Sequence, residues 1–359
     1  MHKVAFGEKF AFSSSISANA WHPKKPNQAY EWWYFDALSD DGNEAVVIVF
    51  LDNFIYSPRY NVAINPDSEP AELRRFPAVS FTYFSGGRQI YRAVNEYPGH
   101  DFFASETEPK CIIGGSGFHF ASAPYGSGFS VSVNLPLARG RQLEAEFEWL
   151  SIETDLFPVP DGADQSIHRW NMVAARSDVS GKMKVFNSSR RVIDVRTFRG
   201  TGYHDHNLDN RWLADTVREW HWGRAHFADL TAVFCSYEET SDAEASNQLL
   251  LIRDGSLRRV AAVISDREYS RDRFGIRYPS RTVLTGEGGE KLSSLTAEVI
   301  DSSFYHLRFL STMTYCDPGE RSQTTSGITE YIAPGALKYR WLNRLSDLRT
   351  GKNGKGPLI

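Results

Sequence analysis

The dominant pattern along the chain is an alternation of apolar and polar side chains with a period of two. Residues 31–36 (EWWYFD) lead through a polar turn at 39–43 into a nearly continuous apolar run at 45–51 (AVVIVFL). Runs rich in β-branched and aromatic residues, separated by Gly, Asn or Asp, are typical of antiparallel strands joined by tight turns. The pattern therefore predicts a β-hairpin whose second strand is buried.

Similar short segments recur through both halves of the chain, with Gly, Pro or Asn at many of the joints. They fall at residues 76–84, 89–94, 117–121, 128–135 and 143–150, and again at 230–237, 248–253, 258–265, 281–285, 295–300, 304–310 and 327–331. Only two segments favour helices, a short one within 209–217 and an amphipathic one over 337–348. Short strands at regular spacing are typical of a barrel or sandwich. We therefore expect an all-β protein with few short helices.

Length and charge narrow the class of protein. A chain of 359 residues is long enough for two domains of ordinary size, and strand counting divides it into domains 1–197 and 198–359, the second ending in the helix. The 40 basic and 44 acidic side chains include no basic run, which argues against nucleic acid as a partner. Aromatic residues make up 13% of the chain, which suits both sheet interiors and apolar pockets.

Cysteine spacing and hydropathy predict where the protein is found. The three cysteines are widely separated and form no C-x-x-C pair, which is typical of a reduced chain without a disulfide framework or a structural zinc site. Neither a secretory signal nor a run of about 20 apolar residues is present. We expect a soluble, cytoplasmic protein, and an apolar substrate would reach it through a transient contact with a membrane or a carrier.

The densest cluster of chemically active side chains lies at 202–207 (GYHDHN). If this segment is extended, His204 and His206 share one face, while Tyr203, Asp205 and Asn207 share the other. Two imidazoles and a carboxylate so close together are costly to bury unless they bind one another or a ligand. A catalytic site and a purely structural hydrogen-bond network both remain open.

Metal binding is a weaker alternative for the same cluster. His-x-His on a strand can chelate a metal ion, and Asp205 or His226 could complete the set. No HExxH and no second His-x-His accompanies it, so we expect no metal site.

Two aromatic segments carry further candidates for binding an apolar molecule. In residues 220–226, Trp220, Trp222, Arg224 and His226 would share one strand face, with His221 opposite. Near the N-terminus Glu31 precedes two adjacent tryptophans, which must point to opposite faces of a strand. One of them could pack in a core while the other lines a cavity, although the composition alone favours a plain core strand.

These motifs together resemble a known family. The segments EWWYFD at 31–36, GTGYHDHN at 200–207, WHWGR at 220–224 and GITEY at 327–331 are similar to the carotenoid 1,2-hydratase (hydroxyneurosporene synthase) family. Its relatives include AttH-like lipocalin-type proteins, kievitone hydratase and certain Diels-Alder cyclases. The resemblance covers nearly the whole chain in order and spacing. It implies two lipocalin-like β-barrel domains packed side by side, a ligand cavity inside or between them, and no metal or organic cofactor.

The resemblance also assigns roles to residues of this chain. Its central motif maps to the catalytic candidates Tyr203, His204, Asp205 and His206, and the substrate-binding candidates are Asn207, Trp220, Trp222, Arg224, Glu31 and Trp33. One departure concerns the substrate. Relatives commonly have Asn-Trp-Gly after the histidines, whereas this chain has Asn207-Leu208-Asp209. The substrate, and with it the reaction, can therefore differ from carotenoid hydration.

The expected function is addition of water to, or cyclisation through, a double bond of an apolar polyene, isoprenoid or polyketide. Asp205 or an imidazolium at His204 or His206 would protonate the alkene, and Trp220 and Trp222 would stabilise the resulting cation. A carboxylic acid kept neutral by an apolar site is the better donor, which favours Asp205 if it is buried. The alternatives are a pericyclase that only folds and polarises its substrate, and a non-catalytic carrier of an apolar metabolite.

Overall fold

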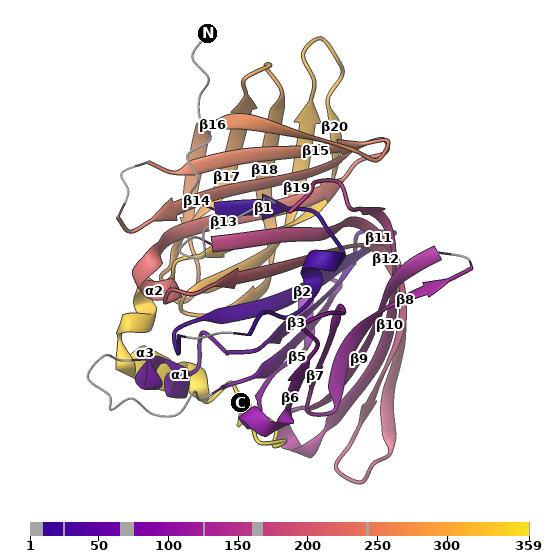
Figure 1. Cartoon of the computed structure of the whole chain (residues 1–359), viewed down its shortest axis with the longest axis vertical. Helices are drawn as coiled ribbons and strands as arrows, with labels where there is room; N and C mark the ends of the chain where they lie inside the picture. The colour runs from indigo at the N-terminus through magenta and orange to yellow at the C-terminus, as the bar shows by residue number, and fades with distance from the viewer. Residues whose placement is uncertain are drawn as a thin grey trace. The chain divides into compact units, whose positions relative to one another are not determined.

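The computed structural model describes residues 10–23, 26–64, 75–124, 126–159, 168–241 and 244–358. Strands dominate these residues (Figure 1), which confirms the predicted all-β class. The described α-helices are short: α1 (Pro58–Ala63), α2 (Leu213–Thr216) and α3 (Arg340–Asp347). The chain forms two compact units. One comprises Leu213–Lys338, and the other comprises Phe10–Trp212 together with the segment that begins at Tyr339.

The unit Leu213–Lys338 is a closed antiparallel barrel, called here the barrel unit. Its eight described strands pair in chain order, and the last pairs with the first. Alternate side chains fill the interior, among them Ala225, Phe234, Leu249 and Met313. The strands are β13 (Val217–His226), β14 (Thr231–Glu239), β15 (Ser246–Arg253), β16 (Ser256–Arg271), β17 (Arg277–Gly286), β18 (Lys291–Ser302), β19 (His306–Cys316) and β20 (Gln323–Ile332).

The other unit is built on one 13-stranded sheet, counted over the described residues, and is called here the curled-sheet unit. The order is β21-β5-β4-β3-β2-β12-β11-β10-β9-β8-β7-β6, with β1 paired in parallel to β11. The strands are β1 (Phe10–Ser13), β2 (Tyr30–Ser39), β3 (Glu44–Leu51), β4 (Ala78–Ser85), β5 (Arg88–Glu96), β6 (Phe102–Ala104), β7 (Lys110–Ile113), β8 (Ser116–Ala123), β9 (Gly126–Pro136), β10 (Gln142–Thr154), β11 (His168–Phe186), β12 (Val192–Asp209) and β21 (Gly351–Lys352).

Aromatic contacts show that this sheet curls around its own core. Trp33 on β2 packs 5.7 Å from Phe118 on β8, although β12, β11, β10 and β9 separate those strands in the sheet. Phe35 on β2 likewise meets Phe129 on β9 and Trp149 on β10. One face of the sheet therefore encloses an apolar core, and this side is called the inner face below.

Most of the strands predicted from alternation are confirmed, including the hairpin of β2 and β3. Most of β11 and β12, the two longest strands of this unit, was not predicted, although residues 192–197 (VIDVRT) carry three β-branched apolar side chains, which are exposed in the structure. The division expected near residue 198 lies inside β12, which pairs on both sides with strands of the curled-sheet unit. The predicted helices correspond to the shorter α2 and α3, while α1 was not predicted.

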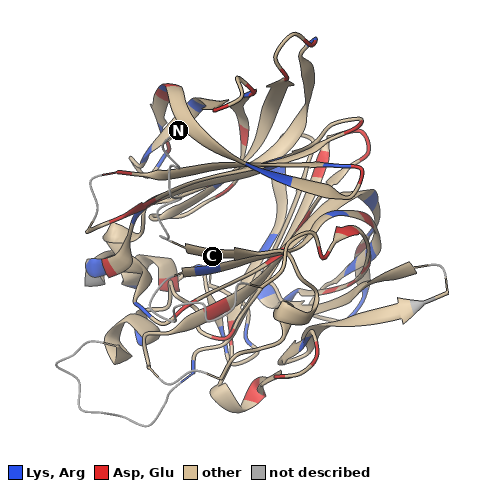
Figure 2. Ribbon diagram, turned by 45° about the horizontal axis from the view of Figure 1, so that its top comes forward, with Lys and Arg blue, Asp and Glu red and all other residues tan. Residues whose placement is uncertain are grey.

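Two further features are the distribution of charged residues and the length of the helices. Basic and acidic residues are interspersed along strands and loops of the described chain (Figure 2). Within the described residues, every helix is too short or too polar to cross a bilayer.

Candidate active site

Pairing between β2 and β12 creates two chemically different faces. The strands run antiparallel, with His204 opposite Phe35 and His206 opposite Trp33. Because side chains alternate along a strand, both histidines lie on the inner face, and Tyr203, Asp205 and Asn207 point to the other, called here the outer face. The predicted separation of the motif into two faces is confirmed.

Asp205 is the centre of a polar cluster on the outer face. Its Oδ2 accepts hydrogen bonds from the Tyr203 hydroxyl at 3.0 Å and from Trp170 Nε1 at 3.1 Å. Its Oδ1 accepts one from the Asn207 amide at 2.8 Å. Asp205 is only 5% exposed, so these donors replace much of the water that a free carboxylate would bind. The carboxyl group is thus fixed in orientation.

A second layer of contacts positions this cluster. His168 Nε2 lies 3.0 Å from the Asn207 amide oxygen, and His168 Nδ1 lies 3.8 Å from Asp209 Oδ2. Asp209 is itself buried and accepts hydrogen bonds from Arg211. Trp32 extends an aromatic surface toward His168, with 6.1 Å between the ring centroids.

Burial changes the acid–base properties of this face. Removal from water, with a further contribution from the charge of Asp205, raises the pKa of Tyr203 well above its ordinary value, so the phenol stays protonated and able to donate. Burial also lowers the pKa of His168, although Asp209 opposes that shift. Tyr203 therefore contacts Asp205 as a neutral phenol, and His168 contacts Asn207 as a neutral imidazole.

His168 and Trp170 were missed by the sequence analysis. They lie two residues apart, which places their side chains on the same face of β11, as with Trp220 and Trp222 on β13. That spacing was a usable signal. Their link to Asp205 and Asn207 depends on the β11–β12 register, in which Trp170 lies opposite Asn207.

On the inner face His204 is packed as a core residue. Its ring stacks on Phe35 with centroids 3.8 Å apart and meets the edge of Phe129 at 4.6 Å. Nδ1 lies 2.9 Å from the Tyr34 carbonyl oxygen, and Nε2 lies 2.9 Å from the Asn19 amide nitrogen. Burial lowers the pKa of His204 to about 3. A neutral ring whose two nitrogens are both engaged is a poor proton donor at pH 7.

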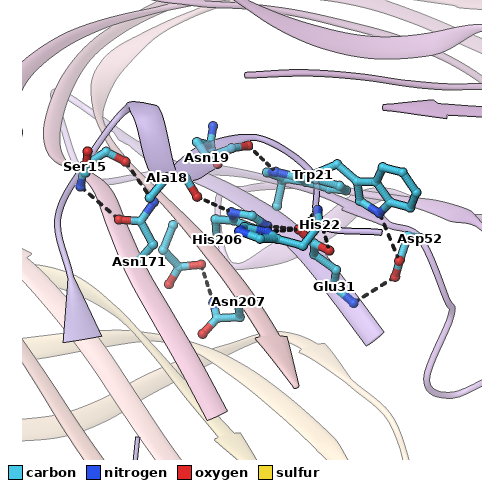
Figure 3. Close-up of polar contacts among 12 residues, drawn as sticks. Ser15, Ala18, Asn19, Trp21, His22, Glu31, Asp52, Asn171, His206 and Asn207 are labelled. Atoms are coloured by element: carbon cyan, nitrogen blue, oxygen red, sulfur yellow. Dashed lines mark hydrogen bonds and ion pairs between the residues drawn. The ribbon is translucent and has the colours of Figure 1, made fainter. Parts of the chain in front are cut away.

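His206 belongs to a different cluster on the inner face. Its Nε2 lies 2.7 Å from Glu31 Oε1, and the same oxygen lies 3.1 Å from His22 Nδ1 (Figure 3). The His206 ring stacks on Trp33 at 4.9 Å. Burial lowers the pKa of His206, while the hydrogen bond to Glu31 acts in the opposite direction. The two histidines of the His-x-His motif therefore bind different partners.

The remaining candidates lie in the barrel unit. Trp220, Trp222 and Arg224 alternate along one face of β13, and all three are buried. His221 points the opposite way, into the barrel, where its ring lies 4.9 Å from that of Phe234. This confirms the predicted sharing of a face. Burial lowers the pKa of His221 to about 3, and His226 Nδ1 lies 3.2 Å from the Thr231 hydroxyl.

Comparison with known proteins places this architecture in a family. The profile of the carotenoid hydratase CrtC family matches residues 157–353, more than half of the chain. The chain belongs to the carotenoid hydratase CrtC family. This confirms the resemblance drawn from the motifs, and this CrtC-family chain is accordingly an enzyme of the hydratase type.

Two curated relatives agree with that assignment. The CrtC-family chain is 26% identical over 354 residues to a hydroxyneurosporene dehydrogenase of Chlorobaculum tepidum, covering 94% of this chain and 91% of the relative. It is 25% identical over 232 residues to an acyclic carotenoid 1,2-hydratase of Rubrivivax gelatinosus. That second match covers 64% of this chain and about half of the relative, 53%.

Solved structures show the same fold at low identity. CghA with Sch210972 has a TM-score of 0.59 at 15% identity, covering 86% of this chain and 89% of its own. A putative AttH of Nitrosomonas europaea scores 0.58 at 13% identity, with 88% and 95% covered. Kievitone hydratase of Nectria haematococca scores 0.53 at 10% identity, with 90% and 98% covered. The lipocalin-like fold expected from the motifs is thereby confirmed.

Proposed function

We propose that this CrtC-family chain hydrates a carbon–carbon double bond of an apolar polyene, isoprenoid or polyketide, with Asp205 as the proton donor. Asp205 would transfer its proton to one alkene carbon, and water would add to the resulting carbocation and release a proton. The observation that carries the proposal is the buried carboxyl group held by Tyr203, Trp170 and Asn207. The proton that is added to the alkene thus comes from the Asp205 carboxyl group.

The hydrogen-bond donors explain how one carboxyl group could serve as a strong acid. The mechanism requires that Asp205 carries its proton when the substrate is bound. As the proton leaves, negative charge develops on the two oxygens, and fixed donors pointing at them stabilise that charge without having to reorient. Tyr203, Trp170 and Asn207 would therefore stabilise the partly charged transition state, and the carboxylate–carbocation pair that follows it, more than the neutral starting state.

Aromatic rings near Asp205 suit the cationic intermediate. Trp32 stacks on Tyr30 at 5.2 Å on the outer face of β2, and the indole of Trp170 contacts the carboxylate directly. Ring faces attract a carbocation through their quadrupole and bind an apolar chain. In the barrel unit, Trp220, Trp222 and Arg224 remain our candidates for substrate binding, as the motif resemblance assigns them.

The substrate class follows from the relatives only in outline. One relative is named for acyclic carotenoids, but by the motif resemblance Leu208 and the ion-paired Asp209 replace a Trp and a Gly. An unchanged carotenoid pocket is therefore not part of the proposal. An apolar substrate of any of these kinds would be delivered through transient contact with a membrane or a carrier.

Replacement of Asp205 tests the acid step. The full chain would be incubated with an acyclic carotenoid in detergent micelles, and products would be separated by chromatography and identified by a mass increase of one water. Asp205→Asn keeps the shape of the side chain and removes the acid, so we expect turnover to be lost while binding, followed by substrate absorbance, persists. Asp178→Asn, an exposed change on β11, is the matched control and should react normally.

Other outcomes separate the alternative functions. An unaffected rate in Asp205→Asn would remove the acid step from the proposal. A product isomeric with the substrate would indicate a cyclase that folds its substrate, and a ligand bound but recovered unchanged by the wild-type chain would indicate a carrier.

A further inference from the structure

Three side chains with metal-binding atoms converge on the inner face of the curled-sheet unit. His22, Glu31 and His206 each present one ligand atom, and these atoms all lie within 4.8 Å of one another. Figure 3 shows the three groups pointing toward a common centre, from β2, from β12 and from the segment that follows Asn19. In sequence His206 is 175 residues from Glu31, so only the fold brings them together.

Proton accounting calls for either a proton or a metal ion at this centre. His206 Nδ1 lies 3.2 Å from the Ala18 carbonyl oxygen, and a carbonyl can only accept, so this nitrogen carries the hydrogen. In the neutral ring Nε2 then holds a lone pair, and it faces Glu31 Oε1 at 2.7 Å. Two lone pairs at that distance repel one another unless a proton or a metal ion lies between them.

His22 makes a metal ion the better occupant. Its Nδ1 lies 3.1 Å from the same Glu31 oxygen, which gives a His2Glu set of the kind that binds zinc. Zinc–ligand bonds of about 2.0–2.1 Å in a tetrahedral site place neighbouring ligand atoms roughly 3.3 Å apart. The two distances to the Glu31 oxygen, 2.7 and 3.1 Å, need only small outward shifts to reach that spacing, and the two imidazole nitrogens lie within 4.8 Å of one another.

The surroundings supply what a metal ligand needs. A ligating histidine usually donates its other ring N–H to a carbonyl or carboxylate, as His206 does to Ala18. Stacking on Trp33 fixes the plane of the His206 ring. Glu31 and His206 are buried, whereas the His22 side chain is 38% exposed. An ion would enter past His22, and water would be its fourth ligand.

We propose that His22, Glu31 and His206 form a binding site for one divalent transition-metal ion, best matched to zinc. The ion would join the segment carrying His22 to β2 and β12 and so hold the strand that bears Asp205. It lies on the inner face, opposite the outer face where Asp205 acts, and takes no part in the proposed acid step. The inference is therefore independent of the proposed function.

Metal binding by the full chain tests the site directly. After chelation and removal of the chelator, the protein would be titrated with zinc chloride, and bound metal would be measured by mass spectrometry of the elements after gel filtration. We expect one zinc per chain and a higher Tm with zinc. Cobalt substituted for zinc should give the visible absorption bands of a four-coordinate ion with nitrogen and oxygen ligands.

Variants distinguish this site from adventitious binding. His22→Gln changes a partly exposed side chain and should fold normally while zinc affinity falls at least about tenfold, and Glu31→Gln should lose binding further. His119→Gln removes an exposed histidine elsewhere and should leave zinc affinity unchanged. Absence of saturable zinc binding in the wild type, or equal affinity in His22→Gln, would overturn the proposal and leave a proton shared between Glu31 and His206.

Discussion

The properties of Asp205 come from side chains on two strands. Tyr203 and Asn207 are its neighbours at alternate positions of β12, and Trp170 reaches it from β11. His204 and His206, adjacent to it in sequence, point to the opposite face. The alternation of side chains along β12 therefore divides this motif into a group around Asp205 on one face and two histidines, in separate environments, on the other.

Removing one donor should weaken catalysis without removing the acid. Trp170→Phe keeps an aromatic ring in the buried position but loses the N–H that contacts Asp205. Since one such donor contributes to charge stabilisation in the transition state, we expect kcat to fall about tenfold to a hundredfold. The measurement is kcat for the hydration that the wild-type chain carries out, with Tm as the check on folding. An unchanged kcat would show that this hydrogen bond is structural only.

The ion pairs of Glu330 in the barrel unit should make the stability of the fold sensitive to acid. Burial by itself would raise the pKa of Glu330, but the charges of Arg308 and His306 hold it at about 2, below its ordinary 4.5. Because the folded-state pKa is the lower one, the stabilisation is complete above about pH 4.5 and is lost as the pH falls toward 2. Glu330→Gln should therefore destabilise the protein by about 3 kcal/mol at pH 7.

Urea unfolding at pH 7 and pH 3 measures this effect. The difference between wild type and Glu330→Gln should shrink at the lower pH. The control is Glu298→Gln, an exposed change on β18, which should alter the free energy of unfolding by less than about 0.5 kcal/mol. A constant difference at both pH values would refute the assigned shift.

At the scale of elements, β12 organises the curled-sheet unit. It is 18 residues long and pairs with β2 on one side and β11 on the other. Its outer face carries Asp205 and its inner face carries His204 and His206. Any slip of one residue would exchange these faces, so the register of β12 controls both clusters.

Glycine at position 202 is required by the packing of β12. A Cβ atom there would lie 2.5 Å from Trp149 Nε1 and 2.8 Å from the Asp36 carbonyl oxygen. Gly202→Ala must push a buried indole or a neighbouring strand aside, and we expect it to lower the free energy of unfolding by about 1–3 kcal/mol. Thermal denaturation measures the change. Gly335→Ala, whose Cβ would meet nothing within 4 Å, should be nearly neutral, and equal Tm values for both variants would contradict the packing argument.

On the scale of the whole molecule, the two units differ in whether their sheet has edge strands. The described barrel strands close on one another, so each of them has a partner on both sides. The curled sheet ends at β6 on one side and at β21 on the other, where Gly351 and Lys352 pair in parallel with Asn95 and Glu96 of β5. The chain thus returns after the barrel to cover β5.

Loss of this returning strand should expose a sheet edge. Ending the chain after Arg349 removes β21 and leaves the backbone of β5 unpaired there, a template for pairing with another molecule. We expect a lower Tm and faster aggregation, measured by differential scanning fluorimetry and light scattering. A chain that ends after Pro357 keeps the pairing and serves as the control. Identical behaviour of both truncated chains would show that β21 protects nothing.

What the sequence determined by itself was local. Period-two alternation was enough to predict the all-β class, most strands, and the two faces of residues 203–207, because side-chain direction along a strand depends only on position. The motifs were enough to identify the family. Neither required knowing which strand pairs with which.

Only the tertiary structure decided the partners. Alternation is the same in every strand, so it does not encode that β12 pairs with β11 and brings Trp170 to Asp205, or that His22 reaches Glu31 and His206. It likewise does not encode why one sheet closes and the other remains a 13-stranded curl over the described residues. Pairing, register and closure arise from contacts between residues far apart in sequence, which form together as each unit buries its own core.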